Sequence, residues 1–313
     1  MEHLENSIRI KITGRCNRAC FFCHKEGGMN EIDDLYFTPK LGIMINRLYS
    51  DFHINTIAVT GGEPLLHSDL VTLLKEISTN TKISKFSLTT NGTVMKEKSY
   101  WKALKESGLY KVNFSISDIL SSVKASETQP EKSVFENQLY TIAILNELDI
   151  IPNINVVVYN DEKYSFNLLN ALFKQEKIRF EIALLPNLTN EHTFAKSQGV
   201  IKGIIKHYGC EKMRASHRKG TSNTVCEYMT NTGHHLQVKT TKLNGNPQWL
   251  NSLCSECKMK KHCQEGFYGL RLESREGQLM IRLCLYKSDK SVLMDLKSFE
   301  DSFVYKELKD AWK

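Results

Sequence analysis

Short runs rich in β-branched residues alternate with amphipathic segments of helical period from residue 7 to about residue 185. The runs predict strands over residues 7–12, 56–59, 85–89, 112–116, 154–158 and 178–184. The amphipathic segments predict helices over residues 39–49, 69–78, 98–106, 134–148 and 165–175. Successive strand–helix units are typical of a parallel sheet. Six strands are too few for a closed eight-stranded barrel, so we expect an α/β fold built as a partial (β/α)6 barrel, with its functional groups at the carboxyl ends of the strands.

The pattern changes after Pro186. Residues 187–225 are polar and basic, with one short helical stretch near residues 200–207. A β-hairpin is predicted from residues 270–272, a turn at 275–277 and residues 279–283, because both arms alternate. Residues 299–313 have the pattern of a final amphipathic helix. We therefore expect two domains, a partial barrel over residues 1–190 and a smaller C-terminal domain with the hairpin over residues 191–313.

Composition narrows the class of protein. The chain has 313 residues, 41% of them apolar and 25% charged, which is the balance of a folded soluble protein. No run reaches the roughly 18 apolar residues of a membrane span, and the first residues lack the apolar stretch of a signal peptide, so we expect a cytoplasmic protein without membrane contact. The nine cysteines are an odd number in such a chain, which favours metal binding or catalysis over disulfides. The net charge of +7 points weakly toward an anionic partner.

Three cysteines stand together directly after the first predicted strand. Cys16, Cys20 and Cys23 have the spacing C-x3-C-x2-C, which lets three thiolates face one point if the backbone loops around it. Thiolates suit an iron–sulfur cluster, and three of them leave one iron of a four-iron cluster open to an exogenous ligand. A zinc site completed by His24 is the alternative, although zinc motifs usually pair C-x2-C units.

This motif resembles that of the radical SAM enzymes. The resemblance implies that the three cysteines hold a catalytic [4Fe–4S] cluster whose open iron binds S-adenosylmethionine, and that Phe22 lies against the adenosyl group. It also implies an oxygen-sensitive enzyme. The second matching element is Gly61-Gly62-Glu63, which follows the second predicted strand and in the family contacts the amino group of the methionine moiety. Paired glycines allow close backbone approach, and a carboxylate suits a cationic amine.

Further matches follow the order of the strands. Thr90 and Asn91 belong to a Thr-Thr-Asn-Gly element at the end of the third predicted strand, and Ser115 and Ser117 end the fourth. Asn155 lies in the fifth. The resemblance implies that these residues bind S-adenosylmethionine, whereas each one alone is equally well explained as a loop hydrogen bond.

Within the family, several segments are similar to the GTP cyclase of molybdenum-cofactor biosynthesis. They are residues 23–27, 61–66, 68–70, 178–181 and the predicted hairpin. The chain departs from the cyclase at His67, where the cyclase has a basic residue, and at Tyr159, where a lysine is common. The resemblance therefore implies an anionic small-molecule substrate derived from a nucleotide or nucleoside. The alternatives are a ribosomally made peptide and, less favoured, a non-catalytic iron–sulfur or zinc protein that binds nucleic acid, for which no stacking aromatic signature is present.

Basic residues supply candidates for substrate contact. Arg271 and Arg282 lie on the predicted hairpin and flank the region of the C-terminal cysteines, and we expect them to bind an anionic group. The alternative is that they are ordinary solvent-facing arginines. Residues 202–219 hold six basic residues against one acid, Glu211; a solvated surface is the plainer interpretation, and a phosphate or carboxylate site the sharper one. The pair His234 and His235 is interpreted as ordinary exposed histidines.

A second cysteine group lies in the C-terminal half: Cys254, Cys257, Cys263 and the distant Cys284. This spacing resembles the outer auxiliary cluster of the SPASM and twitch extensions of radical SAM enzymes, which implies one auxiliary [4Fe–4S] cluster. Phe267 occupies the position where an inner SPASM cluster has a cysteine, so we expect no third cluster. A structural zinc site with four cysteine ligands fits the same spacing. Cys210 and Cys226 have no expected role, although Cys226 could replace one of the four ligands.

The reaction that the resemblance implies begins with one electron from the reduced cluster, supplied by a flavodoxin- or ferredoxin-type reductant. Cleavage of S-adenosylmethionine gives methionine and a 5′-deoxyadenosyl radical, which abstracts a hydrogen atom from the substrate. The protein has to hold the substrate against the radical and exclude water and oxygen.

Overall fold

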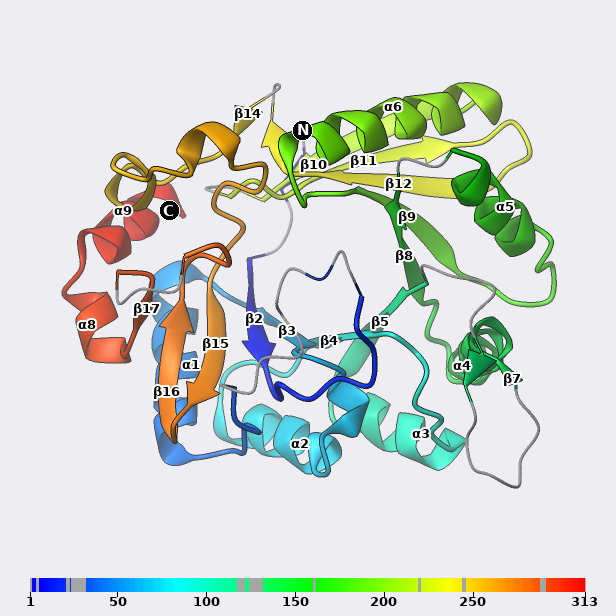
Figure 1. Cartoon of the computed structure of the whole chain (residues 1–313). Helices are drawn as coiled ribbons and strands as arrows, with labels where there is room; N and C mark the ends of the chain where they lie inside the picture. Colours follow the sequence, from blue (N-terminus) through cyan, green and yellow to red (C-terminus); the bar gives the residue numbers. More distant parts are fainter. Residues whose placement is uncertain are drawn as a thin grey trace.

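The computed structural model describes residues 2–3, 6–20, 23, 32–116, 122–123, 132–159, 162–218, 221–243, 246–287 and 291–312. Its centre is a curved sheet of six parallel strands (Figure 1). They are β2 (Ser7–Lys11), β3 (Thr56–Thr60), β4 (Phe86–Thr90), β5 (Leu109–Ser115), β8 (Asn153–Val158) and β9 (Glu181–Pro186). Every neighbouring pair in the order β9-β8-β5-β4-β3-β2 is parallel, which confirms the predicted α/β fold with a partial barrel.

Helices connect these strands and cover the outside of the sheet (Figure 1). They are α1 (Pro39–Phe52), α2 (Leu70–Asn80), α3 (Lys98–Glu106), α4 (Val134–Glu147) and α5 (Glu162–Phe173). Alternation along β2 shows how the sheet divides its two faces: Ile8 and Ile10 are buried in the core with Leu48 and Phe52, whereas Arg9 faces inward and lines a cavity. The inner face of the barrel is therefore polar, and the hydrophobic core lies between sheet and helices.

The C-terminal half extends the same sheet at both of its ends. At one end β12 (His235–Thr240) pairs parallel to β9 and continues antiparallel into β11 (Thr224–Met229) and β10 (Glu211–His217), with β1 (Glu2–His3) beside β10. At the other end β15 (Arg271–Arg275) pairs parallel to β2, and β16 (Gln278–Arg282) forms the predicted hairpin with it before β17 (Leu293–Met294). Thus strands on both sides of the expected boundary near residue 190 share one sheet.

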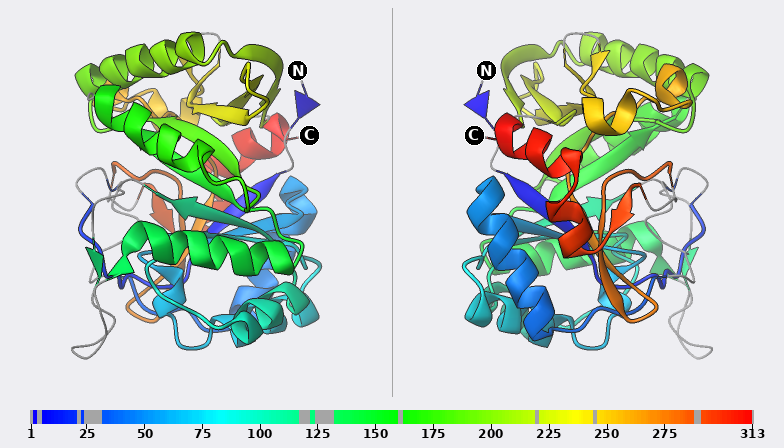
Figure 2. Two further views of the ribbon diagram at one scale, coloured as in Figure 1. Left: turned by 90° about the vertical axis from the view of Figure 1, so that its right-hand side faces the viewer. Right: turned by 90° about the vertical axis from the view of Figure 1, so that its left-hand side faces the viewer.

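The chain ends against its first helix. After α6 (Glu191–His207) and the short α7 (Asn251–Cys254), the predicted C-terminal helix is divided into α8 (Leu296–Glu300) and α9 (Phe303–Ala311). The division falls at Ser302, whose side chain accepts from the Tyr305 N–H and so caps α9. Phe299, Tyr305 and Trp312 pack around Phe52 of α1 with ring centroids 5.3 to 6.0 Å apart. Figure 2 shows the C-terminal helix beside α1. None of the described helices combines the length and apolarity needed to cross a membrane.

The strands β10, β11 and β12 were not among the predicted elements. Residues 211–214 at the start of β10 are all exposed and read Glu-Lys-Met-Arg, so the hydrophobic alternation of a half-buried strand is absent there. The remaining short elements are η1 (Pro64–Leu66), η2 (Lys260–His262), β6 (Ser122–Val123) with β7 (Lys132–Ser133), and β13 (Lys242–Leu243) with β14 (Asn246–Pro247).

Candidate active site

The loop after β2 brings Cys16, Cys20 and Cys23 to the wall of a cavity of about 570 Å³, here called the main cavity. The same wall includes residues at the carboxyl ends of β3, β4, β5 and β8, which is where a partial barrel places its functional groups. Burial raises the pKa of the Cys16 and Cys20 thiols, so binding of a metal at either one must release a proton. In the described parts of the chain, no three His, Cys, Asp or Glu side chains converge on a point that one metal ion would fill.

The turn Gly61-Gly62 after β3 packs directly on the cysteine loop. Gly62 N–H donates to the Thr13 carbonyl at 2.8 Å, and a Cβ at Gly61 or Gly62 would collide with the carbonyls of Thr13 and Arg15. The loop is tied again by Asp34, which accepts from the Thr13 hydroxyl at 2.6 Å and from Arg15 Nη2 at 2.5 Å. We expected the glycines to admit a ligand; the structure shows that they also admit the neighbouring loop, because no side chain fits between the two backbones.

Glu63 is fully buried, and its carboxylate accepts three hydrogen bonds from protein. Oε1 accepts from the Thr90 hydroxyl at 2.7 Å and from the Leu65 N–H at 3.0 Å, and Oε2 accepts from the Asn91 N–H at 2.7 Å. Thr90 and Asn91 line the main cavity, whereas Glu63 is not among its lining residues. Burial raises the pKa of Glu63, and these hydrogen bonds oppose that rise. In this structure Glu63 therefore fixes the residues of the cavity wall.

The other predicted cofactor residues that the structure describes also lie on this wall. Ser115 and Asn155 are directly paired across β5 and β8, and both line the main cavity with Gly61, Gly62, Thr90 and Asn91. Phe22 and Ser117 lie outside the described residues. His67 is buried beyond the wall, where Nδ1 accepts from the Asp69 N–H at 3.1 Å and Nε2 contacts the Leu35 carbonyl at 3.1 Å, so its role is to brace the backbone.

Cationic side chains form another part of the wall. Arg9, Lys239 and Arg271 all line the main cavity. Arg271 is paired with Glu265 at 2.9 Å, the guanidinium of Arg9 lies over the Tyr268 ring at 5.0 Å from its centroid, and Glu265 and Tyr268 line the cavity as well. This combination of thiols and cations around one space suits a cofactor beside an anionic molecule.

Two of these cations, Arg9 and Lys239, were missed by sequence reasoning. Arg9 lies between Ile8 and Ile10 on a correctly predicted strand. Because side chains alternate between the two faces of a strand, its inward direction could have been predicted from the sequence. Lys239 belongs to β12, which was not predicted, and no local signal points to it.

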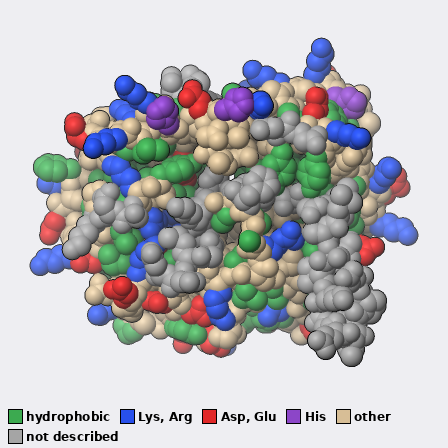
Figure 3. All heavy atoms as spheres, in the orientation of Figure 1, with side chains coloured by type: hydrophobic (Ala, Val, Ile, Leu, Met, Phe, Trp, Pro, Cys, Tyr) green, Lys and Arg blue, Asp and Glu red, His purple; other side chains and the backbone are tan. Residues whose placement is uncertain are grey.

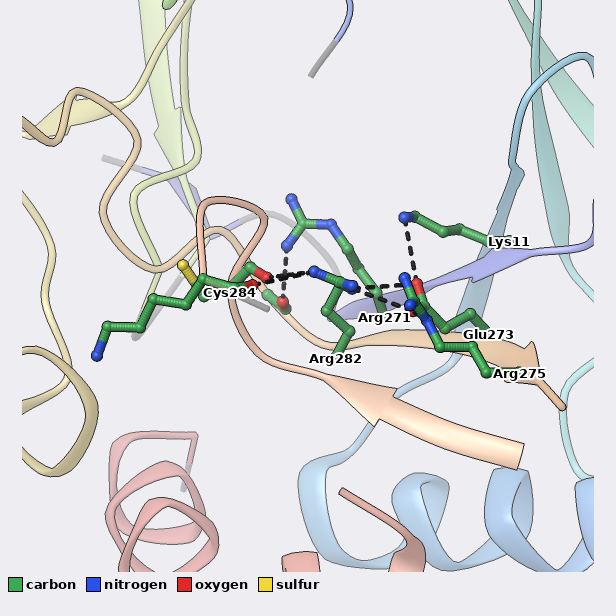
Figure 4. Close-up of polar contacts among 8 residues, drawn as sticks. Lys11, Arg271, Glu273, Arg275, Arg282 and Cys284 are labelled. Atoms are coloured by element: carbon green, nitrogen blue, oxygen red, sulfur yellow. Dashed lines mark hydrogen bonds and ion pairs between the residues drawn. The ribbon is translucent and has the colours of Figure 1, made fainter. Parts of the chain in front are cut away.

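Arg282 has a different place from the one expected. Its Nε lies 3.1 and 3.2 Å from the two carboxylate oxygens of Glu273, and its Nη1 donates to the Cys284 carbonyl at 3.2 Å. Lys11 and Arg275 converge on the same carboxylate (Figure 4). Burial would raise the pKa of Glu273, but these three cations hold it below its ordinary value. Arg282 does not line the main cavity and is committed to this buried network.

The basic stretch 202–219 does not form one surface. Lys202 and Lys206 are exposed on α6, Arg214 pairs with Glu227 at 2.9 Å, and Arg218 is half-buried near Arg9 and Tyr268. On the face shown in Figure 3, Lys and Arg side chains are dispersed among other residue types. Residues 219–220 lie outside the description. The two histidines have protein partners as well, His235 with Glu227 at 3.1 Å and His234 stacked on Phe173 at 4.3 Å.

A second cavity of about 330 Å³, here called the C-terminal cavity, is lined by Cys254, Cys257, Cys263 and Cys284. The structure thus brings together the four cysteines of the predicted auxiliary site, from α7, the η2 region and the loop after β16. Burial raises the pKa of Cys254 to about 11 and also raises that of Cys263. Neither Cys210 nor Cys226 lines this cavity.

The two cavities are neighbours. Leu188 lines both of them, and the segment 284–286 lies between them, with Cys284 and Tyr286 on the C-terminal cavity and Leu285 on the main cavity. The Tyr286 hydroxyl donates to the Leu188 carbonyl at 3.1 Å and ties the two sides of this partition together.

The family model "Radical SAM superfamily" matches residues 10–164. Among curated proteins, the probable GTP 3′,8-cyclase of Methanococcus maripaludis is 40% identical over 118 residues, which are 38% of this chain and 38% of that protein. The GTP 3′,8-cyclase of Campylobacter jejuni is 32% identical over 211 residues, 64% of this chain and 61% of that protein. The matched region therefore spans less than two thirds of the length of either relative.

Solved structures show the same fold across nearly the whole chain. The enzyme anSMEcpe with bound AdoMet covers 98% of this chain and 84% of its own, with a TM-score of 0.57 at 17% identity. SuiB of Streptococcus suis bound to S-adenosylmethionine covers 96% of this chain and 64% of its own, with a TM-score of 0.54 at 15% identity.

The chain belongs to the radical SAM superfamily of enzymes. Membership implies a [4Fe–4S] cluster and S-adenosylmethionine as its cofactors. Within the superfamily, its similarity in sequence is to GTP 3′,8-cyclases.

Proposed function

We propose that the protein cleaves S-adenosylmethionine reductively and abstracts a hydrogen atom from an anionic small molecule derived from a nucleotide or nucleoside. The observation that carries the proposal is one cavity of about 570 Å³ that joins three thiols, six of the predicted cofactor residues and the cationic side chains of Arg9, Arg18, Lys239 and Arg271. The sequence similarity to GTP 3′,8-cyclases supports this class of substrate. Since the solved relatives share under 25% identity, they support the fold alone, and no observation favours a peptide substrate.

The residues present fit the cofactors. Cys16, Cys20 and Cys23 are soft donors spread over one wall, which suits a multi-iron cluster because each thiolate binds a different iron. When bound, the cluster supplies the electron that generates a 5′-deoxyadenosyl radical from S-adenosylmethionine. The Gly61-Gly62 turn, held against the cysteine loop, exposes backbone to the cavity beside these thiols.

The other side chains hold and orient the reactants. Thr90 and Asn91, fixed by Glu63, and the pair Ser115 and Asn155 offer neutral polar groups to S-adenosylmethionine. Arg271, buried and oriented by Glu265, offers a charge-assisted donor to the anionic pole of the substrate. Arg282 is not proposed as a substrate contact, because it does not line the main cavity and its Nε and Nη1 are bonded to Glu273 and to backbone carbonyls.

We further propose that the C-terminal cavity holds one auxiliary [4Fe–4S] cluster on Cys254, Cys257, Cys263 and Cys284. Four free thiols that line one small cavity are the supporting observation. Four cysteine ligands would favour electron transfer or structural support, since direct substrate binding needs an iron with an open position. A zinc ion is the competing occupant.

Anaerobic reconstitution tests the central proposal. The purified protein is loaded with iron and sulfide and incubated with S-adenosylmethionine and dithionite, which replaces a flavodoxin- or ferredoxin-type reductant. We expect 5′-deoxyadenosine and methionine, in amounts that rise when the substrate is added. A protein that contains a four-iron cluster by spectroscopy and yet forms neither product would contradict the proposal.

A further inference from the structure

Lys239 places a cationic side chain inside the partial barrel. It lies on β12, faces the interior of the barrel and lines the main cavity beside Arg9 and Arg271. Its Nζ donates to Asn155 Oδ1 at 2.8 Å, and no carboxylate pairs with it in the described part of the chain. The side chain is half-buried, and an ammonium in such a place whose hydrogen-bond partner is a neutral amide is costly unless an anion approaches it.

The surrounding charges add to that cost. Lys111 of β5 and Arg9 of β2 repel the ammonium, and Glu181 of β9 attracts it. The Glu181 carboxylate already accepts from Gln237 Nε2 at 3.0 Å. Burial, followed by these two cations, lowers the pKa of Lys239 to about 7. The wall of the cavity therefore holds more positive charge than the residues around it neutralise.

We propose that Lys239 is a specificity-determining residue whose ammonium binds an oxyanion of the substrate, a phosphate or a carboxylate, between Asn155 and Arg9. This inference rests on the proposed function and adds a residue to it. The carboxylate of S-adenosylmethionine has the same chemistry, but the position of Lys239 on the wall with Arg9 and Arg271 favours the substrate. The rival explanation is structural, namely that Lys239 only orients Asn155.

Two variants separate charge from hydrogen bonding. Lys239→Gln can still donate to Asn155 but carries no charge, and Lys239→Arg keeps the charge. Lys206→Gln, at an exposed position on α6, is the matched control. Binding of pyrophosphate, GTP and uncharged guanosine to the reconstituted protein is measured anaerobically by calorimetry. For Lys239→Gln we expect roughly ten- to hundredfold weaker binding of pyrophosphate and GTP, as for a lost charge-assisted hydrogen bond. Guanosine binding should change much less, and Lys239→Arg should stay within about threefold of the wild type by the same reasoning.

The dependence on pH provides a second readout. In the wild type the ammonium is present below pH 7 and is lost as the pH rises through the pKa of about 7. In Lys239→Arg the charge persists, so the ratio of the wild-type Kd for GTP to the Arg variant's Kd should rise from pH 6.5 to pH 8.5. Titration of the nucleotide itself cancels in this ratio. A purely structural lysine would leave it constant.

Several results would overturn the inference: wild-type affinity in Lys239→Gln, a wild type that binds neither pyrophosphate nor GTP, or a loss of S-adenosylmethionine affinity as large as the loss of GTP affinity. Failure of the proposed function is recognised separately, because it appears as absent 5′-deoxyadenosine whatever the oxyanion affinity.

Discussion

The main cavity and the C-terminal cavity both gather thiols, yet they are built in opposite ways. In the main cavity, three cysteines come from one loop, and polar and cationic side chains from the barrel strands complete the wall. In the C-terminal cavity, four cysteines come from three separate segments, among apolar neighbours such as Trp249, Leu253 and Leu283. The first arrangement leaves space for ligands that exchange with solvent. The second offers four thiolates, enough to fill every protein-ligand position of a metal cofactor. The predictions below test that contrast.

The largest effect is expected in the main cavity. Replacement of Cys16, Cys20 or Cys23 by Ala should abolish 5′-deoxyadenosine formation, since two thiolates seldom retain a four-iron cluster. Cys210→Ala, outside both cavities, is the control and should keep the activity. Product analysis by chromatography, together with iron content, gives the answer; a triple Cys→Ala variant that still formed 5′-deoxyadenosine would refute the proposed ligands.

The second effect concerns the C-terminal cavity. The loaded protein should contain about eight irons, and Cys263→Ala should contain about four, because a four-iron cluster would be lost. Cys226→Ala, half-buried on β11, should keep all its iron. Metal analysis that found about four irons and one zinc in the wild type would instead establish the zinc site.

The third effect is on stability, at the buried network of cations around Glu273. Arg282→Met leaves the buried Glu273 with fewer cations and also removes donors to the loop of Cys284, so the free energy of unfolding should fall by about 3 to 5 kcal/mol. Arg179→Met, at an exposed position, should change it by less than about 0.5 kcal/mol. Urea denaturation measures both variants, and equal midpoints would show that the network is dispensable.

The same network gives a pH dependence. The pKa of Glu273 is lower in the folded protein than in the unfolded chain. Its contribution to stability is therefore complete above the ordinary carboxyl pKa of about 4.3. This contribution is lost as the pH falls through the folded pKa. Glu273→Gln should flatten this part of the stability curve. An unchanged acid slope in that variant would assign acid unfolding to other carboxylates.

The smallest effect is expected at Glu63. In Glu63→Gln, the remaining amide oxygen can still accept from Thr90 and Leu65, and the NH2 group that replaces the other oxygen can no longer accept from the Asn91 N–H. We expect roughly tenfold weaker binding of S-adenosylmethionine, the size of one lost hydrogen bond of this kind, with unchanged iron content. Calorimetry of the loaded protein measures it. Loss of the cluster itself would mean that Glu63 supports the cysteine loop more than the cofactor wall.

The sequence predicted correctly those parts of the fold in which the hydrophobic pattern marks the strands and a motif follows a strand directly. The six parallel strands are β-branched runs in the sequence, and amphipathic helices separate them. The cysteine loop and the Gly61-Gly62 turn each follow one of these strands directly. The prediction failed where a side chain's position depends on pairing between distant strands. Lys239 reaches Asn155 only because β12 adds to β9. Arg282 stands opposite Arg271 in the hairpin and bonds instead to Glu273, two residues further along the facing strand. Neither partner is readable from local periodicity.

The partition between the cavities is one residue thick at segment 284–286, where Leu285 faces one side and Cys284 and Tyr286 face the other. A close-packed wall of this thickness cannot move on one face without moving on the other. Assembly of the C-terminal cavity therefore helps to set the shape of the space that receives the substrate. Under the proposed function, we therefore expect loading of the C-terminal cavity to affect which molecules the main cavity accepts.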